Sequence, residues 1–219
     1  MSLDKVTIPS YSKKQECFNY ISHFLGLVLA LFVFVFSLVK FINKEIPVLY
    51  FIGLIIFLVS MSVVYLVSGI YHLLNKDNPR KKLFRVLDHC LIYLLIAGTY
   101  TPICFTLFDK NIIGLILVIS EWSGALIGII LNAFFFDKKV VKIISFFLYV
   151  ALGWLVLFTG GFIYLDKMAF AFILGGGITY TIGALLYALG HKKTYFHCIF
   201  HVFVLMSTIL QTIGILILM

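Results

Sequence analysis

Charged side chains are scarce in this sequence. Asp, Glu, Lys and Arg make up 12% of the 219 residues, whereas 63% are hydrophobic. A water-soluble domain carries about twice that share of charge, so the composition excludes an ordinary soluble globular fold. Apolar runs of about 20 residues, the length that crosses the hydrocarbon core of a bilayer, recur along the whole chain. The composition therefore predicts an all-α, polytopic membrane protein.

The sequence also lacks two patterns that would indicate other classes of protein. Its four cysteines show no CxxC spacing and no disulfide framework. We interpret them as packing residues, with a catalytic cysteine as the lesser alternative. Residues 1–18 are polar and contain no charged n-region followed by a short apolar core and a cleavage site. No cleaved signal peptide is therefore expected.

Seven hydrophobic spans follow this short polar tail. They cover residues 19–40, 47–74, 86–107, 112–134, 141–163, 167–189 and 195–218. Pro102 is expected to kink or end the third helix. Because no soluble domain, low-complexity segment or internal repeat is visible, residues 1–219 are expected to form one seven-helix transmembrane domain.

Lysine and arginine are divided unevenly between the two sides of this predicted bundle. Of the 17 basic residues, 13 flank one side of the bundle and four flank the opposite side. These four are Lys40, Lys44, Lys110 and Lys167. The positive-inside rule then places the N-terminus in the cytoplasm and, after seven spans, the C-terminus outside. This distribution accounts for the net charge of +8 without a nucleic-acid partner. Basic cytoplasmic loops and a short tail suit a bacterial plasma membrane, while the oligomeric state stays open.

The last span opens with two histidines, His197 and His201, and contains no charged side chain. Positions i and i+4 of a helix lie on one face, so both imidazoles point the same way. Burying them in an apolar helix is costly unless something binds them. His72 ends the second span and Asp88 begins the third, so helix order places all four residues near the cytoplasmic end of the bundle.

These residue types predict a zinc site. Three neutral imidazoles suit Zn²⁺, and three protein ligands leave a fourth position for water. We therefore predict that His72, His197 and His201 bind the ion. Asp88 would hold or deprotonate the water or orient a ligand. Ser68, one turn before His72 on the same face, would hydrogen-bond the water or an oxyanion.

Three further polar residues have other expectations. His23 lies near the cytoplasmic end of the first helix, where it would either contact and orient the metal ligands or simply be hydrogen-bonded. His89 points about 100° away from Asp88 around its helix, so we expect it to have a packing or interfacial role. Glu121 lies in the middle of the fourth span, either protonated against neighbouring polar groups or lining a polar cavity.

At these positions the sequence resembles the haemolysin III family, within the larger progestin and adipoQ receptor family that includes the adiponectin receptors. The resemblance spans essentially the whole chain, and its specific part is a Ser-x-x-x-His, an Asp and a His-x-x-x-His in this order. The matching segments are Asn19-Tyr-Ile-Ser22-His23, Ser68-Gly-Ile-Tyr71-His72, Leu87-Asp88-His89, Ala97-Gly98-Thr99-Tyr100-Thr101-Pro102 and His197-Cys-Ile-Phe-His201. The resemblance implies zinc held by the three predicted histidines near the cytoplasmic face, with Asp88 and Ser68 beside the bound water.

The same resemblance ties the chain to alkaline ceramidases, which are zinc-dependent membrane hydrolases of lipid amides. The first expectation is a zinc enzyme that hydrolyses an amide or ester bond of a membrane lipid and serves lipid homeostasis. The alternatives are a non-catalytic sensor of membrane state, in which structural zinc joins the second and seventh helices, and a cytolytic activity. The seventh span has no lysine for a Schiff base, which argues against a retinal protein. The short tail argues against an animal-type hormone receptor.

Overall fold

A computed structural model describes residues 3–108, 110–189 and 193–219 of the chain. The described residues form helices joined by short connections, without a β-strand among them. The elements are η1 (Leu3–Lys5), α1 (Lys13–Ile42), α2 (Val48–Leu73), α3 (Lys81–Leu107), α4 (Ile113–Phe135), α5 (Lys139–Gly153), α6 (Leu155–Phe158), η2 (Gly161–Tyr164), α7 (Lys167–Leu189) and α8 (Tyr195–Ile217).

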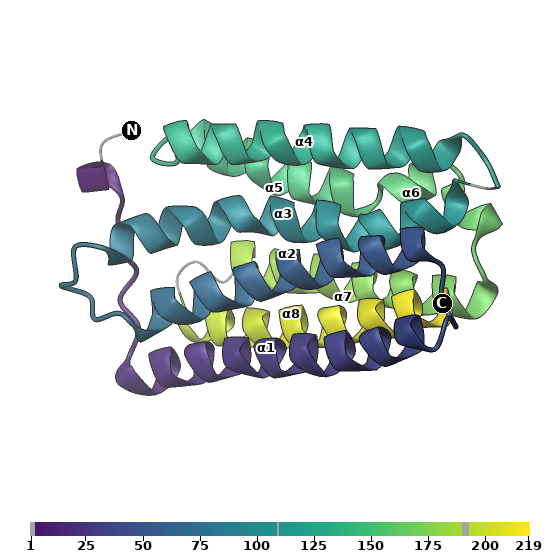
Figure 1. The fold of residues 1–219 in the computed structure, drawn as a ribbon. Helices are drawn as coiled ribbons and strands as arrows, with labels where there is room; N and C mark the ends of the chain where they lie inside the picture. The colour runs from purple at the N-terminus through teal and green to yellow at the C-terminus, as the bar shows by residue number, and fades with distance from the viewer. Residues whose placement is uncertain (1–2, 109, 190–192) are drawn as a thin grey trace.

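The long helices lie side by side with their axes roughly aligned (Figure 1). From α1 to α4 each helix packs against the next, α5 packs on α4, and α8 packs against both α7 and α1. The N-terminal segment, the connection from α2 to α3 and the first turn of α8 lie at one end of the bundle, and the C-terminus lies at the other (Figure 1). We call the first of these the N-terminal end.

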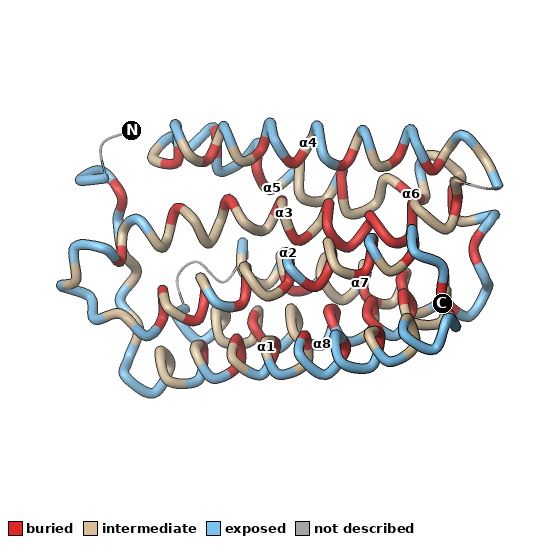
Figure 2. Tube along the Cα trace, in the orientation of Figure 1, coloured by how far each residue is buried: buried red, intermediate tan, exposed pale blue. Residues whose placement is uncertain are grey.

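The outer surface of the bundle is apolar. Buried residues line the inner faces of the helices, whereas the outer faces of α1 and α4 are exposed (Figure 2). Large hydrophobic side chains lie on these faces, and Phe32, for example, is 68% exposed. Within the described ranges, six helices, α1 to α4, α7 and α8, are long and apolar enough to cross a membrane. The chain is therefore an integral membrane protein whose exposed apolar faces meet lipid.

The fifth predicted span is not one continuous helix, so the prediction for residues 141–163 is wrong in this respect. Helix α5 ends at Gly153, and α6 and η2 continue as short pieces. Gly160 adopts a left-handed backbone conformation with φ of 73°, which only glycine adopts at little cost. The Tyr100 hydroxyl donates to the carbonyl oxygen of Gly153 at 2.6 Å, so a carbonyl at the end of α5 finds a partner. Hydropathy detects the apolar run but not these backbone breaks.

Helix α1 begins earlier than predicted. The hydroxyl of Ser12 accepts a hydrogen bond from the Gln15 backbone, and the Gln15 side chain accepts one from the Ser12 backbone. This capping box starts the helix at Lys13, so the last part of the predicted 1–18 tail is helical. As a result, Glu16 and Asn19 lie on the first two turns of α1, at the N-terminal end.

Helix α3 also extends beyond its predicted bounds. It begins at Lys81 rather than at residue 86 and continues past Pro102 to Leu107. Pro102 therefore does not end the helix. The earlier start places Lys81 and Arg85 on the same helix as Asp88, and Lys81 reaches the carbonyl oxygen of Leu74 at the end of α2.

Candidate metal centre

Three imidazole nitrogens meet at the N-terminal end of the bundle. His72 lies in the last turn of α2, and its Nε2 atom is 3.2 Å from Nε2 of His197 and 3.2 Å from Nε2 of His201. The Nε2 atoms of His197 and His201, on the first two turns of α8, are 2.9 Å apart. The structure thus brings together the three histidines that the sequence pattern singled out.

This arrangement fits a metal ion better than it fits hydrogen bonding among the rings. Each neutral Nε2 atom either carries a proton and donates, or has a lone pair and accepts. Three mutually neighbouring atoms cannot alternate between two roles, so at least one pair brings together two donors or two acceptors. A cation bound by all three lone pairs removes that conflict. Two nitrogens on a tetrahedral Zn²⁺ lie about 3.3 Å apart, which is close to the observed separations.

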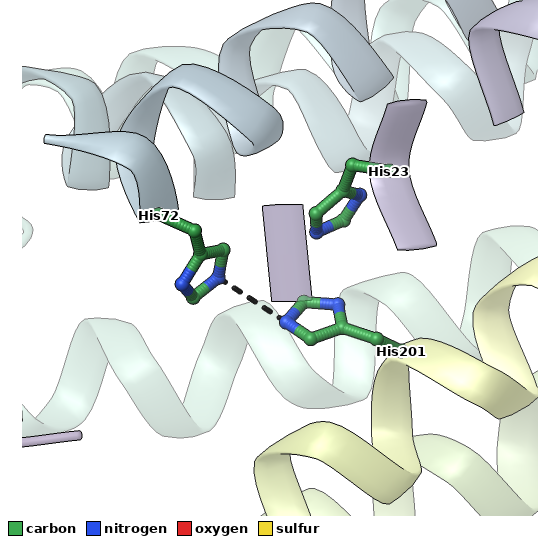
Figure 3. A group of neighbouring side chains, drawn as sticks. All are labelled: His23, His72 and His201. Carbon is green, nitrogen blue, oxygen red and sulfur yellow. Dashed lines mark hydrogen bonds between the residues drawn. The ribbon is translucent and has the colours of Figure 1, made fainter. Parts of the chain in front are cut away.

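A fourth histidine, His23, lies within reach of the same centre. Ligand atoms of His23, His72 and His201 all lie within 4.8 Å of one another, and Figure 3 shows the three rings converging from α1, α2 and α8. The His23 ring stacks on His72, with 5.7 Å between centroids, and meets His201 edge-on at 4.3 Å. His23 is buried, and neither of its ring nitrogens has a hydrogen-bond partner among the described residues. Its lone pair is therefore available to the centre.

The opposite nitrogen of His72 is held by a carboxylate that sequence analysis missed. Nδ1 of His72 lies 2.7 Å from Oε2 of Glu16. Lys81 donates from Nζ to Oε1 of Glu16 at 2.6 Å and to the carbonyl oxygen of Leu74 at 2.7 Å. Because a carboxylate only accepts, the His72 proton belongs on Nδ1, and the Nε2 lone pair then faces the centre. Such carboxylate–histidine pairs orient ligands in metal sites.

Replacing Glu16 with Gln should weaken metal binding by about ten- to a hundred-fold, because the carboxylate that fixes His72 is lost. A competition titration against a chromophoric chelator measures this affinity. Glu45→Gln is the matched control, since the exposed Glu45 pairs with Lys40 far from the histidines. Equal affinities in the wild type and in Glu16→Gln would show that the carboxylate does not support the centre.

Ser68 and Asp88, the two other residues predicted for the site, are hydrogen-bonded to each other. Ser68, buried on α2, donates a hydrogen bond from its hydroxyl to Oδ1 of Asp88 on α3. Ser68 precedes His72 by one helical turn, or roughly 6 Å along the axis. The other carboxylate oxygen, Oδ2, lies 3.7 Å from Nδ1 of His89. The ring of His89 packs edge-on against Phe136. Asp88 on α3 is thus joined to the residue of α2 that lies one helical turn before His72.

The first described residues of the chain cover the centre at the N-terminal end. The Tyr11 ring stacks on His197, with 4.8 Å between centroids and an angle of 14°. Gln15 donates from Nε2 to the Thr194 hydroxyl at 3.0 Å, and Lys76 donates from Nζ to the Ser10 hydroxyl at 3.3 Å. Burial raises the pKa of the Tyr11 hydroxyl, so this group stays a neutral donor. No sequence pattern indicated this cover.

Glu121 lies outside this cluster. It is fully buried on α4, and neither carboxylate oxygen has a hydrogen-bond partner among the described residues. Helix α4 packs against α3 and α5 rather than against the ends of α2 and α8 that hold the histidines. Both expectations for Glu121, a protonated carboxyl and a cavity lining, stay predictions.

Comparison with known proteins identifies relatives over nearly the whole chain. The sequence profile of the family described as "Haemolysin-III related" matches residues 11–212. A protein named hemolysin-3 homolog from Bacillus subtilis (strain 168) is 34% identical over 197 residues, which cover 89% of this chain and 90% of the relative. Hemolysin-3 from Bacillus cereus is 33% identical over 204 residues, which cover 92% and 90%. Together with the six apolar helices, these relatives indicate a bacterial integral membrane protein.

Proposed function

The chain belongs to the haemolysin-III related family, and we propose that it is a zinc-dependent hydrolase of amide or ester bonds in membrane lipids. The observation that carries this proposal is the convergence of three Nε2 atoms within 2.9–3.2 Å. In the proposal His72, His197 and His201 hold the ion. A bound Zn²⁺ supplies Lewis acidity, which polarises a carbonyl and makes water a stronger acid.

Asp88 and Ser68 would handle protons in this reaction. The Ser68 hydroxyl occupies Oδ1 of Asp88 and fixes the carboxylate. The remaining oxygen, Oδ2, would accept a proton from the attacking water and return it to the leaving group, as a general base and then a general acid. The Ser68 oxygen keeps its lone pairs while it donates to Asp88, so it would also accept a hydrogen bond from the attacking water.

We further propose that the whole chain forms one domain with seven spans, in which α5, α6 and η2 together make the fifth. The N-terminus would lie in the cytoplasm and the C-terminus outside, because basic residues concentrate at the N-terminal end. Lys76, Arg80, Lys81 and Lys82 all lie there. The centre would then face the inner leaflet of a bacterial plasma membrane, and the substrate would be a lipid of that leaflet.

Fatty-acid release by the purified protein tests the proposed activity. The protein would be reconstituted in liposomes that contain a short-chain ceramide or a short-chain phospholipid and assayed before and after treatment with a chelator. Release that stops on chelation and returns with Zn²⁺ would support the proposal. A zinc-loaded, well-folded protein that releases no fatty acid from amide or ester lipids would contradict it.

A second candidate function, a structural clasp in a non-catalytic membrane sensor, is favoured by one observation. His23 brings a fourth imidazole within 4.8 Å of His72 and His201. Four protein ligands close a zinc site, as in structural centres, whereas catalytic centres keep one position open. In the clasp, zinc would join α1, α2 and α8 without a position for water.

His23→Ala separates the two candidates. If three histidines hold the ion, this variant should keep about one zinc per chain, because His23 is not a ligand. Metal analysis of the monodisperse protein measures this, with His89→Ala as a control for removing a histidine whose ring packs against Phe136 and is not one of the converging rings. Loss of zinc from His23→Ala but not from His89→Ala would favour the closed structural site over the hydrolase.

A further inference from the structure

Three residues spaced at helical intervals lie on the face of α3 that is turned toward the histidine centre. Lys81, Arg85 and Asp88 occupy positions i, i+4 and i+7, which lie on the same side of a helix. Lys81 contacts Glu16, which holds His72. Asp88 contacts Ser68, one turn before His72. Because the residues on both sides of Arg85 reach the surroundings of His72, Arg85 lies between them and faces the same region.

Two nitrogens of the Arg85 guanidinium lack a hydrogen-bond partner in the part of the chain that the structure describes. Its Nε and Nη1 atoms are shielded from solvent, and neither makes a hydrogen bond among the described residues. The carboxylates on either side of it pair with other groups: Glu16 pairs with Lys81, and Asp88 accepts from Ser68 through Oδ1. A charged group with buried, unsatisfied donors is costly unless an anion pairs with it. The described chain supplies no such anion.

The contacts of its neighbours on α3 place Arg85 beside the histidine centre. Lys81, one turn before it, contacts the Glu16 carboxylate that holds His72, and Asp88, one turn after it, contacts the hydroxyl of Ser68. The Nε2 atom of His72 lies 3.2 Å from those of His197 and His201. A ligand bound at the histidines would therefore bring its polar end within reach of the guanidinium.

We propose that Arg85 binds a phosphate group, so that the lipids taken at the histidine centre carry a phosphate in the headgroup. This inference rests on the proposed function for the identity of the centre, but the phosphate site itself needs neither metal nor turnover. Arginine suits the role because its fork of N–H donors matches two oxygens of a phosphate. Lys76 and Lys82 at the same end add positive charge that attracts anionic lipids.

Binding of a short-chain phospholipid tests the proposal. The full chain, in an uncharged detergent and treated with a chelator, would be titrated with dioctanoyl phosphatidate by calorimetry. Dioctanoylglycerol, which lacks the phosphate, and inorganic phosphate are the companion probes. Arg85→Gln removes the charge, and Arg80→Gln is the matched control, because these are the only two arginines of the chain and Arg80 is exposed.

The wild type and Arg80→Gln should bind the phosphatidate equally, and Arg85→Gln about ten- to a hundred-fold more weakly, as expected for lost hydrogen bonds to a charged group. Dioctanoylglycerol should bind all three proteins alike. Equal phosphatidate binding to all three would overturn the proposal. Arg85-dependent binding of inorganic phosphate without binding of the lipid would show a site for free phosphate and would also overturn it.

Two further measurements keep the outcome interpretable. If Arg85→Gln does not fold, Arg85→Lys retains the charge without the fork and should bind the phosphatidate more weakly than the wild type. Unchanged binding in that variant would count against a bidentate phosphate contact. Because the titration uses metal-free protein, its result does not depend on whether the protein hydrolyses lipids. Conversely, a failure to select for phosphate would not contradict the proposed hydrolase activity.

Discussion

Purified in detergent without chelators, the wild-type protein should contain about one zinc ion per chain, and His72→Ala, His197→Ala and His201→Ala should each contain almost none. The three Nε2 atoms lie 2.9–3.2 Å apart, so each ring supplies one side of the same small site. Removing one leaves two of these ligands, fewer than the three or four protein ligands of zinc sites. Mass spectrometry of the metals in the monodisperse fraction measures the content.

Two controls make this result specific. Asp88→Ala should keep most of its zinc, because the Asp88 side chain hydrogen-bonds to Ser68 and is not one of the three proposed ligands. His89→Ala should keep its zinc as well, since the ring of His89 packs against Phe136. A wild-type protein that is well folded yet free of zinc would contradict the proposed centre. That result would favour a sensor that contains no metal.

The histidine cluster could be predicted from sequence because each part has a local signal. The spacing of His197 and His201 fixes their common face, and the ends of the apolar runs give the depth of His72 and Asp88. Helix order then places these residues at the same end of the bundle. The observed Nε2 distances follow from packing α8 beside α1, and α1 beside α2, which no local pattern specifies.

The contacts that sequence analysis missed all join residues far apart in the chain. Glu16 and His72 are separated by 56 residues, and Tyr11 stacks on His197 from the opposite end of the sequence. Hydropathy places the start of the first span at residue 19, so Glu16 and Tyr11 fall within the predicted polar tail. The capping box at Ser12 and Gln15 was the available signal that α1 starts earlier and that Glu16 is part of it.

The break in the fifth span has a different cause. Residues 141–163 are apolar enough to be counted as one span. A hydropathy window scores only how apolar glycine is and ignores its low helix propensity. Gly153 ends α5, and Gly160 takes a left-handed conformation before η2. The Thr-Gly-Gly segment at residues 159–161 was the signal in the sequence, because glycine lowers helix stability by about 1 kcal/mol relative to alanine.

Asp88→Asn should lower fatty-acid release by about a hundred- to ten-thousand-fold, the usual contribution of a general acid–base group. The amide oxygen of asparagine still accepts the hydrogen bond from Ser68, so the position of the side chain is kept while its ability to take a proton is lost. Zinc content should stay near that of the wild type. Turnover of a short-chain lipid amide or ester by the zinc-loaded protein measures the effect.

Asp77→Asn is the matched control for this exchange, because Asp77 is an exposed carboxylate in the connection from α2 to α3. It should retain full activity. Ser68→Ala should lose less activity than Asp88→Asn, since it leaves the proton-accepting carboxylate in place. Near wild-type turnover in Asp88→Asn would exclude Asp88 as the base. A loss of activity accompanied by loss of zinc would instead show that the carboxylate supports the metal centre, because the two roles differ in whether the ion remains bound.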